Sequence, residues 1–267
     1  MTGGSYDPTD GSVKGFEERD GCADVRLLQC ASVCALCNDA QLARDEDSGE
    51  FVRVGEPTEC ALRVLAEKLG PPPFPKPDGY EQAGTWQRAA LSWRHAFDRQ
   101  ATLEFDRGRK SMSTVCTRGD ATSLYVKGAP DSVIARCTRV RREDGSVVPL
   151  DEALRSALVE KVTAMASRPL RCLALATKEA DAAAVVASAG LCLMVVAART
   201  TLKSMPTGPR TVPGISLCKM LTSSTSRGSR PSASTSTCTT RRAASLARGY
   251  SSKAAHIAGV HSTEQPA

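Results

Sequence analysis

The chain has 267 residues, of which 41% are hydrophobic and only 11 are aromatic. This length fits one large domain or two small ones, with a core built mainly from Ala, Val and Leu. The net charge of +6 is uneven, because residues 201–267 carry +8 and the first 200 residues carry −2. The overall charge therefore says nothing about the partner of the globular part.

The cysteines indicate a reduced, cytosolic protein. They number 11, an odd count at irregular spacings, and the start MTGGSYDPTDG lacks the basic and apolar regions of a secretory signal. Cys30, Cys34 and Cys37 form the local group CASVCALC, which could contribute to a zinc site. Zinc needs four ligands, usually as two separated pairs, and no second pair is present. The group is better interpreted as small buried residues on a helix face.

The first half of the chain predicts helices separated by turns. Residues 1–24 are rich in Gly, Asp and Ser and predict a looped opening segment, and residues 25–40 place apolar side chains at helical spacing. The polar segment NDAQLARDEDSGE, residues 38–50, predicts a loop or hairpin. A short strand then leads to a turn at Gly55.

A second helix is expected after this turn, with Thr58 as its N-cap and Gly70 at its end. The run PPPFPKP behind Gly70 cannot be helical and predicts an exposed connection. A further helix is expected over Ala83–Phe97.

The middle of the chain predicts two neighbouring strands that both carry cations. LEFDRGRKSMSTV (Leu103–Val115) and YVKGAPDSV (Tyr125–Val133) are joined by the polar turn CTRGDATS. If the first strand is regular, Arg107 and Arg109 share the face of Phe105. These cations are either solvated charges on an edge strand, or part of a cleft for an anion with a flat ring.

The second half predicts alternating helices and strands. Pro130 and Asp131 favour the start of a helix through Cys137, and Asp144-Gly145 predicts a turn within a strand segment. LDEALRSALVEKVTAMAS has the clearest helical periodicity in the chain, and RPLRCLALAT predicts a compact apolar strand.

Two later segments differ from the rest. Ala182–Ala198 runs 17 residues without a charge, which is short and Ala-rich for a membrane span, so a buried helix end and a buried strand explain it better. Of the last 67 residues, 23 are Ser or Thr, and few large apolar side chains remain. We expect disorder there, because too little apolar surface can be buried to offset the entropy of ordering.

Common catalytic and phosphate-binding motifs are missing from this sequence. There is no GxxxxGK(S/T), no GxGxxG after a strand, no HExxH and no GxSxG. Only His95, His256 and His261 could supply histidine-based acid–base chemistry. A stacking and charge site remains, in which Phe105 offers a flat ring and Gly128 lets a ligand approach the backbone. The residues alone support no more than an anion or nucleotide cleft.

Several segments, taken in order, resemble the nucleotide-binding domain of P-type ATPases of the sarco/endoplasmic-reticulum calcium-pump branch. They are CALCNDA, VGEPTECALRVLAEKLG, LEFDRGRKSMSTVCT, YVKGAPDSVIARCTRV and LRCLALAT, and the opening TGGSYDPTDGSV resembles the hinge segment of that branch. The resemblance covers residues 2–177 and implies an α+β fold, a twisted, mainly antiparallel sheet flanked by helices. It implies a hinge-like segment at residues 1–24 and a nucleotide-binding domain at 25–198. The Ser/Thr/Arg-rich tail at 199–267, for which we expect disorder, matches nothing in the family.

The resemblance also implies an ATP site, with Mg²⁺ carried by the nucleotide. Phe105 would stack on adenine, Glu59 would contact the adenine amino group, and Lys127 would lie at the floor. Arg107 and Arg171 would reach the phosphates, and Lys110 would lie beside the nucleotide. The full set of positions that line the family's pocket is Glu59, Phe105, Arg107, Lys110, Lys127, Gly128, Arg171 and Leu173.

The sequence also departs from the family. It contains neither the DKTGT string with the phosphorylated aspartate, nor TGDGxND, nor TGES. We therefore expect a fragment that binds ATP without hydrolysing it or moving ions, cytosolic by itself and at the cytosolic face of the endoplasmic reticulum in a parent pump. Its partners would be the other domains of that pump. A regulatory fragment that binds a membrane ATPase remains an alternative, as does a nucleic-acid-binding protein that uses the basic tail.

Overall fold

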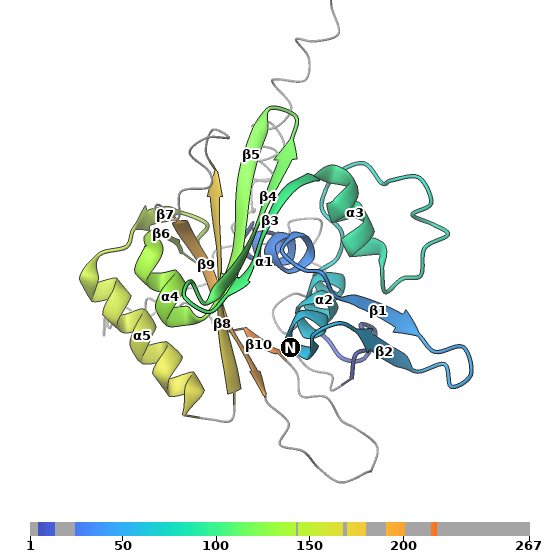
Figure 1. The fold of residues 1–267 in the computed structure, drawn as a ribbon, viewed down its shortest axis with the longest axis horizontal. Coiled ribbons are helices and arrows are strands. Elements are labelled where there is room, and N and C mark those ends of the chain that lie inside the picture. Colours follow the sequence, from blue (N-terminus) through green and yellow to red (C-terminus); the bar gives the residue numbers. More distant parts are fainter. Residues whose placement is uncertain are drawn as a thin grey trace, which may run out of the picture. The chain divides into compact units, whose positions relative to one another are not determined.

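The computed structural model (Figure 1) describes residues 5–13, 25–142, 144–167, 170–179, 191–200 and 215–217. Its helices and strands are, in chain order, α1 (Val25–Leu36), β1 (Gln41–Arg44), β2 (Phe51–Val54), α2 (Pro57–Leu69), α3 (Arg88–Ala96), β3 (Asp98–Asp106), β4 (Ser111–Arg118), β5 (Ala121–Gly128), α4 (Pro130–Arg136), β6 (Cys137–Arg141), β7 (Val147–Pro149), α5 (Glu152–Ala166), β8 (Leu170–Glu179), β9 (Leu191–Thr200) and β10 (Ile215–Leu217). This confirms the predicted α+β class.

A mixed sheet holds the described residues together. Its strand order is β3-β4-β5-β8-β9-β6-β7, with β10 paired to β9, and β1 and β2 form a separate hairpin. Neighbouring strands pair antiparallel, except that β6 and β9 are parallel. The sheet is therefore mainly antiparallel, as the resemblance implies.

Two hydrophobic clusters cover the two faces of the sheet. In the ribbon of Figure 1, α1, α2 and α3 lie on one side of the sheet, and α4 and α5 lie on the other. Alternate residues of a strand point to opposite faces. Met112 and Tyr125 pack with α1, α2 and α3, whereas Val115 and Val126, an odd number of positions away, pack with α4 and α5. The face that carries α1–α3 is called the α1 face below.

Local sequence signals explain where most helices begin and end. Pro57 and Pro130 occupy the first turns of α2 and α4, where a missing N–H costs little. Gly70 ends α2 with a φ of +82°, which favours glycine. Asp151 caps α5, because its carboxylate accepts a hydrogen bond from the Leu154 N–H at 2.8 Å.

Three local expectations were wrong. Leu103–Val115 is not one strand, because β3 ends at Asp106 and the chain turns before β4. The N-cap of α2 is Glu56, without a side-chain hydrogen bond, and Thr58 lies inside the helix. The helix expected over Ala83–Phe97 is shorter, since α3 begins only at Arg88. Each error concerns a boundary set by turns rather than by apolar periodicity.

Most of the predicted tail at 199–267 and most of Ala182–Ala198 lie outside the described residues. Two described strands nevertheless include residues of the predicted tail, since β9 runs on to Thr200 and β10 (Ile215–Leu217) pairs with it. No helix in the described part of the chain is both long enough and apolar enough to cross a membrane.

Candidate functional site

A buried ion pair connects the sheet to two helices on the α1 face. Lys127 on β5 is only 7% exposed, and its Nζ lies 2.6 Å from Oε1 of Glu59 on α2. The same Nζ donates a hydrogen bond to the Cys37 carbonyl, just beyond α1, at 2.5 Å. A buried ammonium group needs such partners, because desolvation without them is costly. The two contacts fix Lys127 at the base of the α1 face.

Glu59 is itself held in place by the chain between α1 and β1. Its Oε2 accepts a hydrogen bond from the Asp39 N–H at 3.1 Å, and its carbonyl accepts one from the Asn38 side chain at 2.9 Å. Asn38 is fully buried and also donates to the Cys34 carbonyl. The segment CNDA, Cys37–Ala40, therefore positions the carboxylate that meets Lys127.

Phe105 lies in a bulge of β3. The register passes from Leu103↔Ser113 to Asp106↔Ser111, so Glu104 and Phe105 together oppose Met112. Met112 in turn pairs with Lys127 in the next strand. The bulge thus puts Phe105 at the end of a row across the sheet that contains Met112 and Lys127. Its side chain is 60% exposed, the highest value among the exposed large hydrophobic residues in the described part of the chain.

Leu173 and Arg171 extend this row along β8. Lys127 pairs with Leu175, and residues two and four positions earlier on a strand share its face. Leu173 is partly buried against the α1-face cluster, whereas Arg171 is exposed. The strands therefore give Lys127, Leu173 and Arg171 a common face.

The remaining predicted positions are arranged differently. Arg107 lies in the exposed turn after β3, so it does not continue the face of Phe105 as a regular strand would require. In the same turn, Lys110 has a φ of +49° and its Nζ lies 2.9 Å from Asp131 Oδ2. A Cβ on Gly128 would lie 2.5 Å from the Lys110 carbonyl oxygen. Backbone and side-chain atoms of the chain itself occupy the space beside Gly128. This glycine therefore leaves no room for a ligand at its own Cα.

The thiols near this site are protonated at neutral pH. Burial raises the pKa of Cys37, although the charge of Lys127 opposes the shift. Burial also raises the pKa of Cys116 to about 12. Since the thiolate is the nucleophilic form, neither group is a reactive cysteine. Cys30, Cys34 and Cys37 are all fully buried, as predicted from their spacing.

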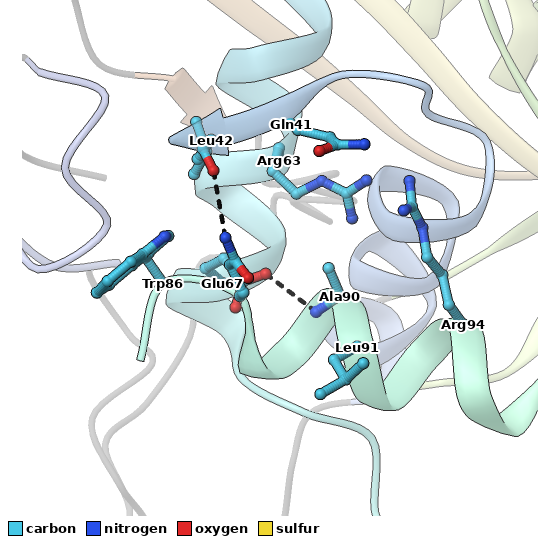
Figure 2. A pocket seen from close by; sticks show the side chains of 9 residues that line it. Gln41, Leu42, Arg63, Glu67, Trp86, Ala90, Leu91 and Arg94 are labelled. Atoms are coloured by element: carbon cyan, nitrogen blue, oxygen red, sulfur yellow. Dashed lines mark hydrogen bonds between the residues drawn. The ribbon is translucent and has the colours of Figure 1, made fainter. Parts of the chain in front are cut away.

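A pocket that was not predicted from the sequence lies between α2, α3 and β1 (Figure 2). The residues that line it are Gln41, Leu42, Arg63, Glu67, Trp86, Gln87, Ala90, Leu91 and Arg94. None of these is among the predicted nucleotide-binding residues. Arg63 and Glu67 lie four residues apart on α2, a spacing at which side chains are neighbours on one helix face. Only the packing of α3 against α2 encloses them.

Glu67 connects the two helices of this pocket. Its two carboxylate oxygens accept hydrogen bonds from the Ala89 and Ala90 N–H groups, at 2.8 and 3.0 Å, at the start of α3. These bonds satisfy N–H groups that a helix cannot pair internally. Burial nevertheless raises the pKa of Glu67 to about 7, against the effect of these bonds and of Arg63.

No group of three or more His, Cys, Asp or Glu side chains in the described ranges could hold a metal ion. The charged groups described in this subsection are the Lys127–Glu59 pair, the exposed cations near Phe105 and the two arginines that line the pocket between α2, α3 and β1.

Comparison with known proteins identifies the domain family of this chain. Residues 26–201 match the family model for the P-type ATPase cytoplasmic domain N. The chain is 41% identical over 157 residues, 57% of its length, to calcium-transporting ATPase 3, endoplasmic reticulum-type, of Arabidopsis thaliana. It is 37% identical over 191 residues, 67% of its length, to calcium-transporting ATPase 2, endoplasmic reticulum-type, of the same plant.

A fungal relative shows the same pattern. The endoplasmic reticulum calcium ATPase srcA of Aspergillus fumigatus is 44% identical over 155 residues, or 57% of this chain. The aligned regions cover only 15%, 18% and 16% of these three relatives, respectively. The match is thus confined to one domain of much longer proteins. Because the family model covers most of the chain, this protein belongs to the P-type ATPase cytoplasmic N-domain family.

Proposed function

We propose that this chain binds ATP on the α1 face of its sheet, as the nucleotide-binding lobe of a calcium-transporting P-type ATPase. The observation that carries the proposal is an exposed Phe105 ring in one strand-to-strand row with the buried Lys127–Glu59 pair. The relatives that match this chain are named as calcium-transporting ATPases of the endoplasmic reticulum. The proposal therefore includes a calcium-transporting parent pump in that membrane, whereas this chain itself is proposed to bind ATP without moving ions.

The residues present fit an adenine ring. Phe105 leaves most of its surface in solvent, so a flat base can stack on it. Leu173, partly buried on the same face, offers an apolar surface beside the row. Glu59 retains acceptor capacity for an amino group, since each of its oxygens makes one of the contacts described above.

Lys127 supports the site from below and holds Glu59 in place. Its ammonium group has three donors, and Glu59 and the Cys37 carbonyl engage two of them. One donor remains for a nucleotide atom. Because Lys127 is buried and already paired, it fits the floor of the site better than a freely reaching phosphate ligand.

Exposed cations are suited to the phosphates and to a Mg²⁺ ion that the nucleotide brings with it. Arg107 and Arg171 are both exposed, and long flexible side chains can reach oxygens several ångströms away. Lys110 would have to leave Asp131, and an exposed pair of this kind contributes at most about 1 kcal/mol. Gly128 acts indirectly, by allowing the turn that carries Lys110 to approach β5.

The proposal includes binding without hydrolysis. The printed sequence has no DKTGT string to supply the aspartate that such pumps phosphorylate. The other domains of a membrane ATPase are the proposed partners of this lobe, and its cytosolic position at the endoplasmic reticulum follows from the same proposal.

ATP titration followed by backbone amide chemical shifts tests the proposal. We expect a dissociation constant between high micromolar and millimolar, or about 4–6 kcal/mol, with shifts around Phe105 and Lys127. Phe105→Ala should weaken binding by about tenfold, because stacking on an aromatic side chain contributes roughly 1–3 kcal/mol.

Phe51→Ala is the matched control, because it also removes one phenylalanine ring. Phe51 packs edge-on against Trp86, at 5.4 Å between ring centroids, and lies on the separate β1–β2 hairpin. Its loss should leave ATP affinity unchanged. The proposal fails if millimolar ATP moves no signals near Phe105, or if the two variants bind ATP equally well.

A further inference from the structure

The pocket between α2, α3 and β1 is large enough for a small molecule. Its volume is about 170 Å³, and an engineered cavity of about 150 Å³ can hold benzene. Gln41 and Gln87 on its rim are exposed, so solvent reaches it. Figure 2 shows Arg63 and Arg94 extending into this space from α2 and α3. The kind of molecule that the pocket can bind therefore depends on which hydrogen-bond acceptors and negative charges already surround these two cations.

Arg63 is buried without a full set of partners. It is 3% exposed, and its Nε and Nη2 both donate to the Ala40 carbonyl, at 3.3 and 3.0 Å. Its Nη1 is buried and has no hydrogen-bond partner. Burial, followed by the nearby charge of Arg94, lowers the pKa of Arg63 to about 10. The side chain still carries its charge at neutral pH, and one donor points to no protein acceptor.

No carboxylate of the described residues forms an ion pair with either arginine. Glu67 is the acidic group in the pocket lining, and both of its oxygens accept hydrogen bonds from α3. Asp39 lies near Arg94 but is paired with Arg99 at 2.6 Å. The pocket thus has an excess of positive charge and spare donors.

We propose that this pocket binds a small oxoanion, a phosphate or a carboxylate, between Arg63 and Arg94. Guanidinium groups bind planar or tetrahedral oxoanions through paired hydrogen bonds. The indole Nε1 of Trp86, which also lines the pocket and is buried without a partner, supplies a further donor. The anion would add to the counter-charge that Glu67, whose oxygens accept hydrogen bonds from α3, supplies only in part. This site shares no residue with the proposed nucleotide site.

The test uses the side-chain signal of Trp86 in the whole chain. Sodium phosphate and, separately, sodium acetate are titrated to millimolar concentration, with sodium chloride keeping the ionic strength constant. The Trp86 indole N–H signal should shift and saturate, while that of Trp93, buried in the α1-face cluster, should stay fixed. A stronger response to phosphate assigns a phosphate ligand, and a stronger response to acetate assigns a carboxylate.

Arg94→Gln and Arg88→Gln form a matched pair, since both arginines lie on α3 and only Arg94 lines the pocket. Arg94→Gln should weaken anion binding by about tenfold, because it removes a charged hydrogen-bond donor. Arg88→Gln should bind as wild type does. Arg94 is exposed, so its replacement should not prevent folding. The proposal is overturned if neither anion shifts Trp86 more than chloride does, or if both variants lose equal affinity.

Discussion

Lys127 and Arg63 are both buried cations, 7% and 3% exposed, but their surroundings differ. Lys127 has a carboxylate at 2.6 Å and a carbonyl at 2.5 Å. Arg63 contacts one carbonyl, faces another arginine and keeps one donor unpartnered. A cation that the fold neutralises contributes to the scaffold, whereas one that the fold leaves uncompensated is available to an external anion. The two sites therefore make opposite predictions for mutation.

The largest effect is expected at the buried pair. Lys127→Met should lower the free energy of unfolding by about 3–5 kcal/mol, because it leaves the Glu59 carboxylate without its partner. Urea denaturation measures this loss. Adding Glu59→Gln to the variant should recover part of it, since the two residues interact directly.

Lys110→Met is the control for this experiment. Its ammonium group also pairs with a carboxylate, Asp131 at 2.9 Å, but both side chains are more than half exposed. Its loss should cost less than about 1 kcal/mol. Equal losses for the two lysine variants would contradict the distinction between a scaffold pair and a surface pair.

A smaller effect concerns the pH dependence of stability through Glu67. Burial raises its pKa to about 7 in the folded protein, compared with about 4.3 in an unfolded chain. The folded state therefore binds this proton more tightly. The resulting stabilisation is complete below the unfolded pKa and is lost as the pH rises through the folded value.

The Glu67→Gln variant isolates this contribution. Between about pH 8 and pH 5, wild type should gain roughly 2 kcal/mol more stability than Glu67→Gln, after allowance for the partial exposure of Glu67. Chemical denaturation at several pH values gives the two curves. Parallel curves would show that Glu67 titrates as it does in the unfolded chain.

The smallest effect is expected for Arg94→Gln without added anion. The variant loses a 3.3 Å hydrogen bond from Nη2 to the Asn38 carbonyl and also loses the repulsion between Arg94 and Arg63. These changes oppose each other, so the free energy of unfolding should change by no more than about 0.5 kcal/mol. A thermal unfolding series can measure this. A loss as large as that of Lys127→Met would mean that Arg94 is part of the scaffold too.

The sequence correctly predicted those helix starts, turns and helices that depend only on residues close together in the chain. Pro130 starts α4, Asp144-Gly145 turns the chain between β6 and β7, and the apolar spacing of residues 150–167 gives α5. The motifs shared with the P-type ATPases also indicated the family, because they are strings of contiguous residues. Propensity, periodicity and sequence motifs are all properties of short contiguous segments, so they can be recognised without the tertiary structure.

The residue pattern within a single segment was less informative where a turn or bulge interrupts a strand. The pattern of Leu103–Val115 predicted one strand, although the chain reverses its direction after Asp106. It placed Arg107 on the face of Phe105, which would require an unbroken alternation. The bulge, in which Glu104 and Phe105 together oppose Met112, decides instead which way Phe105 faces. A bulge depends on pairing with the next strand and has no reliable signature in one segment alone.

Only the tertiary structure decided what compensates each buried charge. Lys127 meets Glu59, 68 positions earlier in the sequence. Arg63 contacts the Ala40 carbonyl on one side and faces Arg94 on the other. Composition and spacing show that these side chains are charged, and the fold determines whether water, a carboxylate or another cation surrounds them. Burial and counter-charge arise from contacts between distant segments, so the sequence specified the elements and the family, and their packing specified the two sites.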